Sequence, residues 1–550
     1  MKTLTAIGLF LFASTPQLSA ETFSQMDTVQ TTWVAHYSGP DSSDEVTGLV
    51  LDAAGNVYMT GESRNLNNNL DYITVKYNSS GIQQWAGRYD FSVGDDESAA
   101  IAVDGAGNVY VTGTSDGGAT ILDIATIKYD AQGAPQWAVR YNAGRSDFAS
   151  SLALDAGGNV YVAGSSRVST NSQLHYDMIV IKYNPSGDQR QFVSFNRNVL
   201  LLGNTDDFAR ALALDQDGNI YVTGTSTTPR FIEVNIATVK YNSAGGQQWA
   251  AFYNGPGSAL DEPSALAVDE LGNAYVAGTS QGRGTGDDIV VIKYNASGVE
   301  QWAKRYTSSG TNPDAATDMA LDASGNIFVT GSTNVAGNNN FVTIKYNPNG
   351  DQQWIAFYDS PAKFSDGANA LALDQAGNVY VTGSSMSQSL STDFLTIKYN
   401  GAGIQQWVVR YAGPNKFDVA KAIAVDGSND VIVTGESLNI GATTIKYTQI
   451  PATSIEDEST RRPLEFSLWQ NYPNPFNPST TIRFDLPKAG DVTLSVYNVL
   501  GEGIEALVDE FLPAGSYKIN WKPKGLSNGV YFYRFTAGSF TQTRKLLLMK

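Results

Sequence analysis

One phrase recurs eight times in this chain of 550 residues: Asp, two residues, Gly-Asn, and then an alternating apolar segment that ends in Gly. The copies begin at Asp52, Asp104, Asp155, Asp215, Asp269, Asp322, Asp374 and Asp426, and Asn429-Asp430 replaces Gly-Asn in the last one. A regular period of this length indicates a repeat architecture. The residues alternate between apolar and polar, which is typical of strands and not of helical repeats.

Each copy resolves into four strands. In the second copy we expect them at residues 99–104, 108–113, 125–129 and 136–141. Gly133 marks the hairpin between the last two. A four-stranded meander repeated at this period is a propeller blade. The sequence therefore predicts an all-β chain with an eight-bladed β-propeller.

The two ends of the repeat array complement each other. The eighth copy stops after its third strand, at residues 445–447, and residues 32–37 match the fourth strand at residues 84–89. We expect this N-terminal strand to complete the last blade and to close the ring, which leaves no unpaired strand edge. Fourth strands carry a tryptophan in seven copies, with Phe192 expected at that place in the remaining copy; the tryptophans are Trp33, Trp85, Trp137, Trp249, Trp302, Trp354 and Trp407.

The phrases NVYVTG, TIKYN and QWAVRY resemble bacterial β-propeller repeats of the SBBP type. The resemblance covers residues 31–448 and implies a propeller fold and an extracellular setting, but no particular activity. The family is named for a seven-bladed propeller, so seven blades is the alternative to eight.

The composition changes after Thr448. Residues 449–464 carry Pro, Ser and charge without periodicity and are expected to form a linker. Strands are expected at residues 480–485, 492–497, 516–521 and 530–535, so residues 465–550 are expected to form a small β-sandwich.

This C-terminal segment closely resembles the type A C-terminal sorting domain of the type IX secretion system. The matching phrases are NYPNPFNPSTTIRFDLP, VYNVLG, GSYKINW, LSNGVYFYRF and KLLLMK. The resemblance implies export across an outer membrane, the secretion machinery as partner, and a delivery signal that is often removed on arrival. An unrelated carbohydrate-binding sandwich is the alternative.

The N-terminus has the pattern of a secretory signal peptide. Lys2 precedes an apolar run at residues 4–13, and small residues at 18–20 predict cleavage after Ala20. A membrane anchor is the alternative, but the run is shorter than the roughly 20 residues that span a bilayer. We expect residues 1–20 to be removed, the mature chain to have no transmembrane segment, and the protein to be secreted or attached to the outer cell surface.

Composition excludes several kinds of chemistry. The chain has no cysteine, so disulfides, thiolate nucleophiles and Cys-ligated metals are absent, and a formal net charge of −18 without basic patches argues against nucleic acid. Of the two histidines, His36 occupies a fourth-strand position that holds arginine in other copies, which predicts a structural role. His175 is expected in a long loop, as a ligand, a general base or neither. Carboxylate pairs remain as possible catalysts.

The acidic residues follow the repeat. Eight residues before each repeat Asp lies another, expected in the loop that leads into the inner strand; these are Asp44, Asp96, Asp147, Asp207, Asp261, Asp314, Asp366 and Asp418. In one interpretation, each aspartate only fixes its turn by accepting backbone N–H groups. Alternatively, the eight form a ring at the channel mouth that holds a cation, such as calcium, or a cationic ligand. No other cofactor is expected. One lysine in each third strand is predicted to form ion pairs between blades.

Three functions are compatible with these features. The first is a secreted or surface-displayed binding module without catalysis, whose ligand would be a glycan, a protein or a cation. The second is an extracellular polysaccharide hydrolase or lyase that uses loop carboxylates, with Asp206 and Asp207 of the divergent third blade as the first pair to test. The third is a structural spacer in a surface layer.

Overall fold

The computed structural model describes residues 28–40, 44–91, 94–118, 122–170, 173–197, 205–228, 233–308, 311–335, 337–360, 362–387, 389–450, 466–471, 474, 476, 479–523 and 525–548. The expected signal peptide lies outside the described residues. The chain divides into two compact units, of which the first spans Gln25–Pro451 and the second contains Ala452–Lys550.

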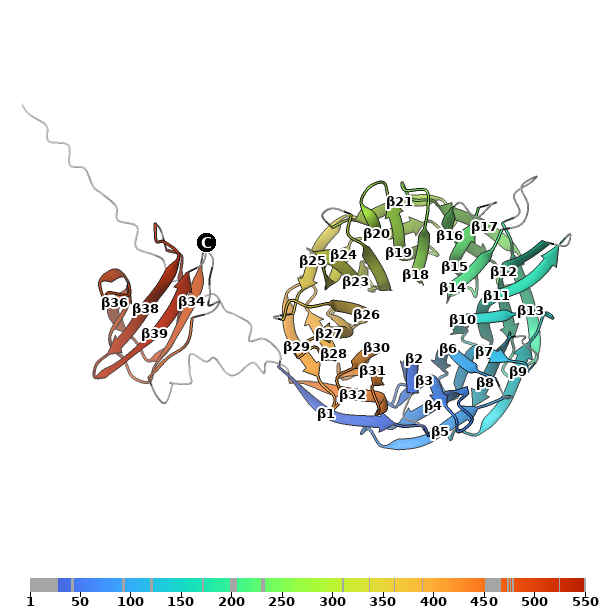
Figure 1. The fold of residues 1–550 in the computed structure, drawn as a ribbon, viewed down its shortest axis with the longest axis horizontal. Coiled ribbons are helices and arrows are strands. Elements are labelled where there is room, and N and C mark those ends of the chain that lie inside the picture. Colours follow the sequence, from blue (N-terminus) through green and yellow to red (C-terminus); the bar gives the residue numbers. More distant parts are fainter. Residues whose placement is uncertain are drawn as a thin grey trace, which may run out of the picture. The chain divides into compact units, whose positions relative to one another are not determined.

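The first unit is a ring of four-stranded antiparallel sheets, each of which forms one blade (Figure 1). The prediction of an all-β propeller is confirmed. Within the described residues the ring contains eight such sheets. Blades 1 to 7 follow chain order, and blade 8 combines β30, β31 and β32 with the N-terminal β1.

The first strands lie nearest the centre of the ring (Figure 1). They are β2 (Asp44–Leu51), β6 (Asp96–Val103), β10 (Asp147–Leu154), β14 (Asp207–Leu214), β18 (Asp261–Val268), β22 (Asp314–Leu321), β26 (Asp366–Leu373) and β30 (Asp418–Val425). The second strands are β3 (Val57–Arg64), β7 (Val109–Asp116), β11 (Val160–Thr170), β15 (Ile220–Thr227), β19 (Ala274–Gly282), β23 (Ile327–Val335), β27 (Val379–Met386) and β31 (Val431–Ser437).

The third and fourth strands complete each blade. The third strands are β4 (Leu70–Tyr77), β8 (Leu122–Tyr129), β12 (Gln173–Tyr183), β16 (Val234–Tyr241), β20 (Gly286–Tyr294), β24 (Asn338–Tyr346), β28 (Thr392–Tyr399) and β32 (Gly441–Ile450). The fourth strands are β5 (Gln83–Tyr89), β9 (Pro135–Tyr141), β13 (Gln189–Phe195), β17 (Gln247–Tyr253), β21 (Glu300–Tyr306), β25 (Gln352–Tyr358), β29 (Gln405–Tyr411) and β1 (Thr28–Tyr37).

Strand β1 pairs antiparallel with β32, so the two ends of the repeat array meet in one blade. Thr28 lies opposite Ile450, so β32 runs two residues into the segment that we expected to be linker. The rest of that segment, from residue 451, lies outside the described residues. Strand β2 of blade 1 in turn contacts β30 of blade 8.

The repeat phrase shapes the inner hairpin of each blade. Asp52 accepts four hydrogen bonds, from the backbone N–H groups of Ala54 and Asn56 and from the side chains of Asn56 and Tyr58. Burial raises the pKa of Asp52, but these hydrogen bonds outweigh burial and hold the pKa below its usual value. Gly61, at the end of the phrase, has no room for a Cβ because the carbonyl of Glu45 lies against it where the first strand bulges.

A repeated contact, which we call the clasp, joins each blade to the next. In blades 1, 2, 5 and 6 the third-strand lysine and the fourth-strand tryptophan donate to one carbonyl in the outer hairpin of the following blade. In blades 4 and 8 the tryptophan donates to such a carbonyl, while the lysine pairs with aspartates of its own blade. In blade 1, Lys76 Nζ and Trp85 Nε1 lie 3.1 and 3.2 Å from the Ala131 carbonyl oxygen. The Trp85 ring packs against Gly133, whose φ of 85° and lack of a Cβ let the ring approach.

The clasp corrects the expected role of the repeated lysines. Lys128, Lys293 and Lys345 reach the next blade through the carbonyls of Pro185, Pro348 and Gly401, not through carboxylates. The lysine ion pairs that do form stay within one blade; they are Lys182–Asp155, Lys240–Asp215 and the pairs of Lys446 with Asp426 and Asp430.

Blade 3 departs from this pattern by one side chain. The pairing of Lys182 with Gln191 places Gln191, and not Phe192, at the tryptophan position. The expectation for Phe192 was therefore wrong by one residue. With its amide oriented to satisfy both atoms, Gln191 donates to the Ser243 carbonyl at 3.3 Å and accepts from Gly245 N at 2.7 Å. A glutamine thus replaces the tryptophan N–H in the clasp.

Blade 8 lacks an outer hairpin because its fourth strand comes from the other end of the array. The side chain of Gln449 supplies the missing acceptor: its Oε1 receives Lys398 Nζ at 2.6 Å and Trp407 Nε1 at 3.4 Å. Its Nε2 donates to the hydroxyl of Tyr380 at 2.9 Å. A side-chain amide therefore takes the place of the backbone carbonyl.

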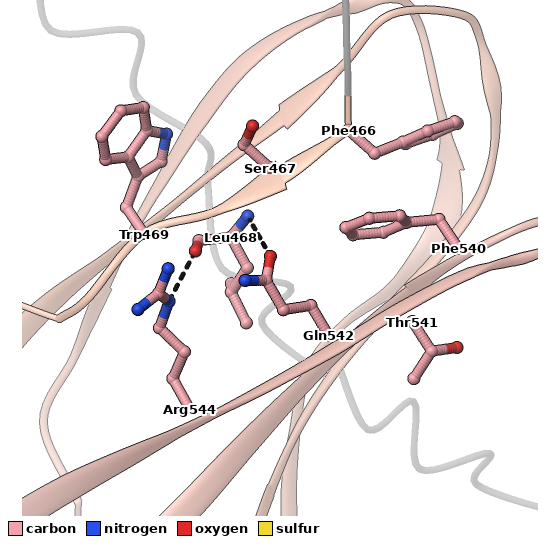
Figure 2. A pocket seen from close by; sticks show the side chains of 8 residues that line it. All are labelled: Phe466, Ser467, Leu468, Trp469, Phe540, Thr541, Gln542 and Arg544. Atoms are coloured by element: carbon pink, nitrogen blue, oxygen red, sulfur yellow. Dashed lines mark hydrogen bonds between the residues drawn. The ribbon is translucent and has the colours of Figure 1, made fainter.

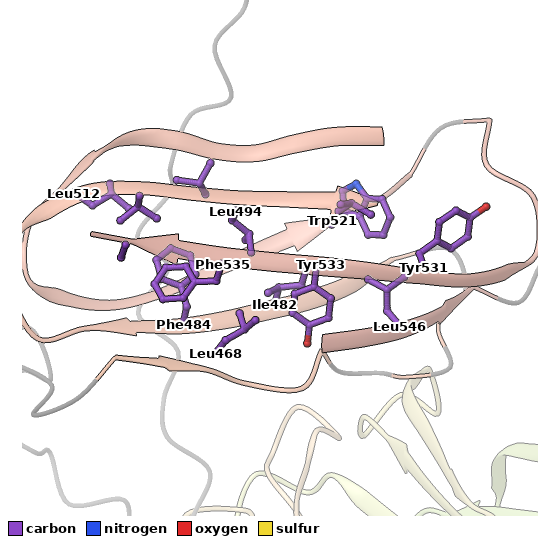
Figure 3. Packing of buried hydrophobic residues seen from close by; sticks show 14 of the residues in the cluster. Leu468, Ile482, Phe484, Leu494, Leu512, Trp521, Tyr531, Tyr533, Phe535 and Leu546 are labelled. Carbon is purple, nitrogen blue, oxygen red and sulfur yellow. The ribbon is translucent and has the colours of Figure 1, made fainter. Parts of the chain in front are cut away.

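Within its described residues, the second unit is a two-sheet sandwich of seven strands. One sheet contains β33 (Ser467–Leu468), β34 (Thr480–Leu486) and β37 (Gly515–Trp521), and the other contains β36 (Gly503–Leu512), β35 (Gly490–Tyr497), β38 (Gly529–Ala537) and β39 (Phe540–Leu548). Alternate residues of the two sheets form one apolar core around Phe484, Tyr533 and Phe535 (Figure 3). Sequence reasoning missed β33, β36 and β39.

Candidate functional site

The eight aspartates expected on the acidic face are each the first residue of an inner strand, not loop residues as we expected. All are 0–4% exposed. Each accepts one backbone N–H from the preceding loop. The pairs are Gly39–Asp44 (2.7 Å), Phe91–Asp96 (3.0 Å), Ala143–Asp147 (2.8 Å), Arg197–Asp207 (2.9 Å), Gly255–Asp261 (2.8 Å), Ser308–Asp314 (2.6 Å), Ser360–Asp366 (2.7 Å) and Gly413–Asp418 (2.8 Å).

In two of these carboxylates the second oxygen accepts a hydrogen bond from a hydroxyl of the adjacent strand. Thr333 donates to Asp314 Oδ1 at 2.6 Å, and Ser385 donates to Asp366 Oδ1 at 2.5 Å. Burial raises the pKa of Asp207 to about 6 and raises, to a smaller extent, that of Asp96, Asp147, Asp261, Asp366 and Asp418. This geometry favours the turn-fixing interpretation; cation binding by the ring stays a prediction.

The aspartates near the start of the third strands have a partner that sequence reasoning missed. Four of them are buried and form ion pairs with a partly exposed fourth-strand arginine: Arg88–Asp71 (2.5 Å), Arg140–Asp123 (2.7 Å), Arg305–Asp288 (2.6 Å) and Arg410–Asp393 (2.8 Å). At the same register, blades 4 and 6 carry Asn with Phe, namely Asn235 with Phe252 and Asn340 with Phe357. In these six blades the acidic residue and its partner change together, which aligned repeats could have revealed.

Both histidines lie close to the positions of these ion pairs in their own blades. His36 pairs with Thr443 at the arginine register of blade 8, its Nδ1 lies 3.0 Å from the Thr443 hydroxyl, and burial lowers its pKa. His175 does not lie in a loop, as we expected, but in β12, paired with Val168 of β11. Its Nε2 lies 3.3 Å from Asp177 Oδ1, which also accepts a hydrogen bond from Asn196 at 2.8 Å.

The carboxylate pair expected to be catalytic is occupied by hydrogen bonds. Asp206 Oδ1 accepts the backbone N–H of Tyr176 at 2.9 Å, which ties blade 3 to blade 4. Asp207 accepts from Arg197 N and from the hydroxyl of Thr205, both at 2.9 Å. Both carboxylates therefore fix the junction between two blades.

One group of carboxylates among the described residues is close enough to share a cation. Oxygens of Asp71, Asp90 and Asp96 lie within 4.8 Å of one another. The guanidinium of Arg88 already contacts Asp71 at 2.5 Å and supplies positive charge to this group. Calcium binding stays a prediction.

The inner strands differ from one another at their second position. Aligned on the strand-opening aspartates, the eight residues are Glu45, Glu97, Phe148, Phe208, Glu262, Ala315, Gly367 and Val419. Aromatic residues occur only in blades 3 and 4. The Tyr176 ring lies between them, with its centroid 6.0 Å from that of Phe148 and 4.8 Å from that of Phe208. We call Phe148, Tyr176 and Phe208 the aromatic strip.

A hollow of about 420 Å³ adjoins the aromatic strip on the inner strands of blades 4 and 5. It is lined by Phe208, Arg210 and Glu262, with hydroxyls from Thr225, Ser264 and Thr279. Arg210 and Glu262 are both exposed. An aromatic face beside a few convergent polar groups is the usual composition of a small-ligand site.

Glutamates gather on the first and second strands of blades 8, 1 and 2. Glu62 is buried, and burial together with the charges of Glu97, Glu45 and Glu436 raises its pKa to about 8. Lys421 pairs with Glu436 at 3.0 Å. The inner surface of the ring is therefore acidic in these blades and aromatic and cationic in blades 3 and 4.

The sandwich has a hollow of its own, of about 350 Å³ (Figure 2). The rings of Phe466 and Phe540 stack there at 5.3 Å. Gln542 Oε1 accepts from Leu468 N at 3.0 Å, and Arg544 Nε donates to Leu468 O at 2.7 Å. Side chains of β39 thus form hydrogen bonds with the backbone N–H and carbonyl at the free edge of the short strand β33. These groups are then not available to pair with a further strand.

Two family models match this chain. Residues 470–549 match the secretion system C-terminal sorting domain, and residues 92–118, 198–229, 253–284 and 301–338 match the SBBP β-propeller repeat. The ring is built from SBBP repeats, and the tail is a type IX secretion sorting domain. The protein is therefore a β-propeller that is exported and either released or attached to the cell surface. No helix long and apolar enough to cross a membrane occurs in the described part of the chain.

The curated and solved relatives are distant. An uncharacterized WD repeat-containing protein of Acanthamoeba polyphaga mimivirus is 22% identical over 70% of this chain, which spans 36% of that relative's length. Similar solved structures include PorZ, a surface component of the type IX secretion system of Porphyromonas gingivalis (11% identity, 92% of this chain, 75% of that chain, TM-score 0.36). The polysaccharide lyase Uly1 is another (12% identity, 75% of this chain, 91% of that chain, TM-score 0.41). Likenesses this remote carry no argument about activity.

Proposed function

We propose that the ring is a non-catalytic binding module, which the sorting domain delivers to the outside of the cell. The observation that carries this proposal is that the repeated carboxylates are the same in every blade, whereas the inner surface differs between blades. The eight strand-opening aspartates are buried and accept backbone hydrogen bonds, while the exposed or half-buried second positions of the inner strands differ from blade to blade.

The state of the carboxylates supports binding over catalysis. A glycoside hydrolase needs an acid and a second carboxylate that can reach the substrate or its water. Asp206 and Asp207 instead hold the junction between blades 3 and 4 through three hydrogen bonds, to Tyr176, Arg197 and Thr205. Freeing either carboxylate would break a blade contact.

The test compares binding with turnover on the same material. The mature protein is incubated with a panel of extracellular polysaccharides and with outer-surface extract, and retention on each ligand is measured. New reducing ends and unsaturated products are measured in parallel. We expect retention on at least one ligand without product. Product formation that is lost in Asp207→Asn would favour the hydrolase or lyase instead, and retention on no ligand would favour a structural spacer.

A further inference from the structure

The aromatic strip and the adjoining hollow break the repeat at one place in the ring. A residue needed for the blade fold recurs in every copy, as the strand-opening aspartate does. The second position is aromatic only in blades 3 and 4, and the fourth position is an arginine only at Arg210. The fold does not require these residues, so another role must account for them.

The strip is held in place by the longest hairpin among the described blades. Strands β11 and β12 have 11 residues each. They extend the hairpin to Tyr176, whose backbone N–H binds Asp206 of blade 4. Arg167, opposite Tyr176 in the pairing, donates its own N–H to Ser146 O at 3.0 Å. The ring of Tyr176 is therefore fixed between Phe148 and Phe208.

Two arginines lie beside the strip. The guanidinium of Arg167 lies 5.8 Å from the centre of the Tyr176 ring. Among the described residues, neither Arg167 nor Arg210 forms a side-chain ion pair within 4.0 Å, whereas the fourth-strand arginines of blades 1, 2, 5 and 7 all do. An arginine without a carboxylate partner can receive an anionic group through two parallel hydrogen bonds.

We propose that the aromatic strip and the hollow beside Arg210 bind a polysaccharide that carries carboxylate or sulfate groups. The apolar faces of sugar rings stack on Tyr176 and Phe208, and the anionic groups bind Arg167 and Arg210. Glu262 and the threonine hydroxyls accept and donate hydrogen bonds to sugar hydroxyls. This proposal rests on the binding function above and gives it a location and a ligand class.

The opposite side of the ring explains why the anionic chain takes this position. The exposed side chains of Glu45 and Glu97 of blades 1 and 2 would repel it. The aromatic strip, with Arg167 and Arg210 beside it, is thus the part of the inner surface that an anionic polymer can occupy. A neutral polysaccharide would gain the stacking but would leave both arginines without an anionic partner.

The experiment measures the affinity of the mature protein for two matched pairs of polymers. These are polygalacturonate with its carboxyl-reduced form, and dextran sulfate with dextran. We expect at least tenfold tighter binding to the charged member of a pair, and the pair that responds identifies the anionic group. Equal affinity for charged and neutral polymers, or binding to poly-glutamate but to no polysaccharide, would overturn the ligand class.

Variants then locate the site. Phe208→Ala and Arg210→Gln should each weaken binding to the charged polymer about tenfold. Val419→Ala and Lys421→Gln change the equivalent positions of blade 8 and should leave binding unaltered, although Lys421→Gln removes the same charge. Melting temperatures within a few degrees of the parent verify the fold. If all four variants bind like the parent, the location is wrong while the binding function stands; if the parent binds no ligand of any class, the binding function itself fails.

Discussion

The clasp between blades and the second positions of the inner strands follow the repeat to different degrees. The clasp keeps an N–H donor in one blade and an oxygen acceptor in the next even where its residues change, as Gln191 and Gln449 show. The second positions keep no common chemistry: they include glutamate, phenylalanine, alanine, glycine and valine. A contact that every blade needs, such as the clasp, recurs in each copy of the repeat. The second positions are not needed in this way, so their residues differ and give each part of the inner surface its own chemistry.

Deletion of strand β1 should have the largest effect on the stability of the contacts between blades. Removal of Thr28–Tyr37 leaves blade 8 without its fourth strand and blade 1 without the Trp33 contact to Ser79. We expect a loss of roughly 10 kcal/mol of unfolding free energy and a tendency to aggregate through the open edge. Thermal unfolding and light scattering measure this.

A synthetic peptide of residues 28–37 is the control for that deletion. It should bind the shortened protein and restore part of the melting temperature. A shortened protein that stays monomeric with an unchanged melting temperature would show that β1 does not close the ring.

Disruption of a single clasp should cause the next largest loss of unfolding free energy. Trp354→Ala removes the ring from Gly403 and the N–H from the Gly401 carbonyl, and we expect a loss of about 4 kcal/mol in urea unfolding. Gln353→Ala, one residue away and exposed, should cost less than about 0.5 kcal/mol. Equal effects of the two variants would remove the clasp from the account of ring stability.

The ion pairs of the third strands offer a swap between blades. Arg410→Phe leaves the buried carboxylate of Asp393 unpaired and should cost about 3 kcal/mol. The double variant Asp393→Asn/Arg410→Phe recreates the pair found in blades 4 and 6 and should recover most of that loss. A double variant no more stable than the single one would show that the two positions are not coupled.

The glutamate side of the ring predicts a smaller, pH-dependent effect. Since burial and neighbouring charges raise the pKa of Glu62 to about 8, the folded state holds a proton that the unfolded chain releases near pH 4.5. Stability of the parent should therefore fall as the pH rises from 4.5 to 8 and level off above 8. Glu62→Gln should reduce this decline, to which Asp207 and the other buried aspartates also contribute, and should gain on the order of 2 kcal/mol at pH 8.5.

Melting temperatures of parent and variant at pH 4.5, 6.5 and 8.5 measure that difference. Glu97→Gln, at an exposed position nearby, is the control and should change the pH profile less. A parent whose stability rises between pH 4.5 and 8 would contradict the raised pKa.

Much of the fold could be predicted from the sequence because alternation and turn residues are local signals. The repeat phrase predicted the four strands of each blade, and Trp33 predicted the N-terminal strand that completes blade 8. The errors arose where one strand had to be placed against another. Phe192 was misplaced by one residue, and the β11–β12 hairpin was taken for a loop, because register is set by pairing.

The candidate site could be predicted only in part. Aspartates at a fixed spacing predicted an acidic face, but their burial depends on how the preceding loop folds back over Asp44 and its equivalents. The aromatic strip joins Phe148 and Tyr176 of one blade to Phe208 of the next. Residues so far apart in sequence meet only because adjacent blades stack.

The sequence by itself determined the β-propeller, its repeated blades and the export tail, because each depends on patterns that recur within some fifty residues. Only the tertiary structure decided which carboxylates are buried, which arginines are paired and which side chains meet at the inner surface. Those properties depend on contacts between blades, and a blade acquires its neighbours only when the ring forms.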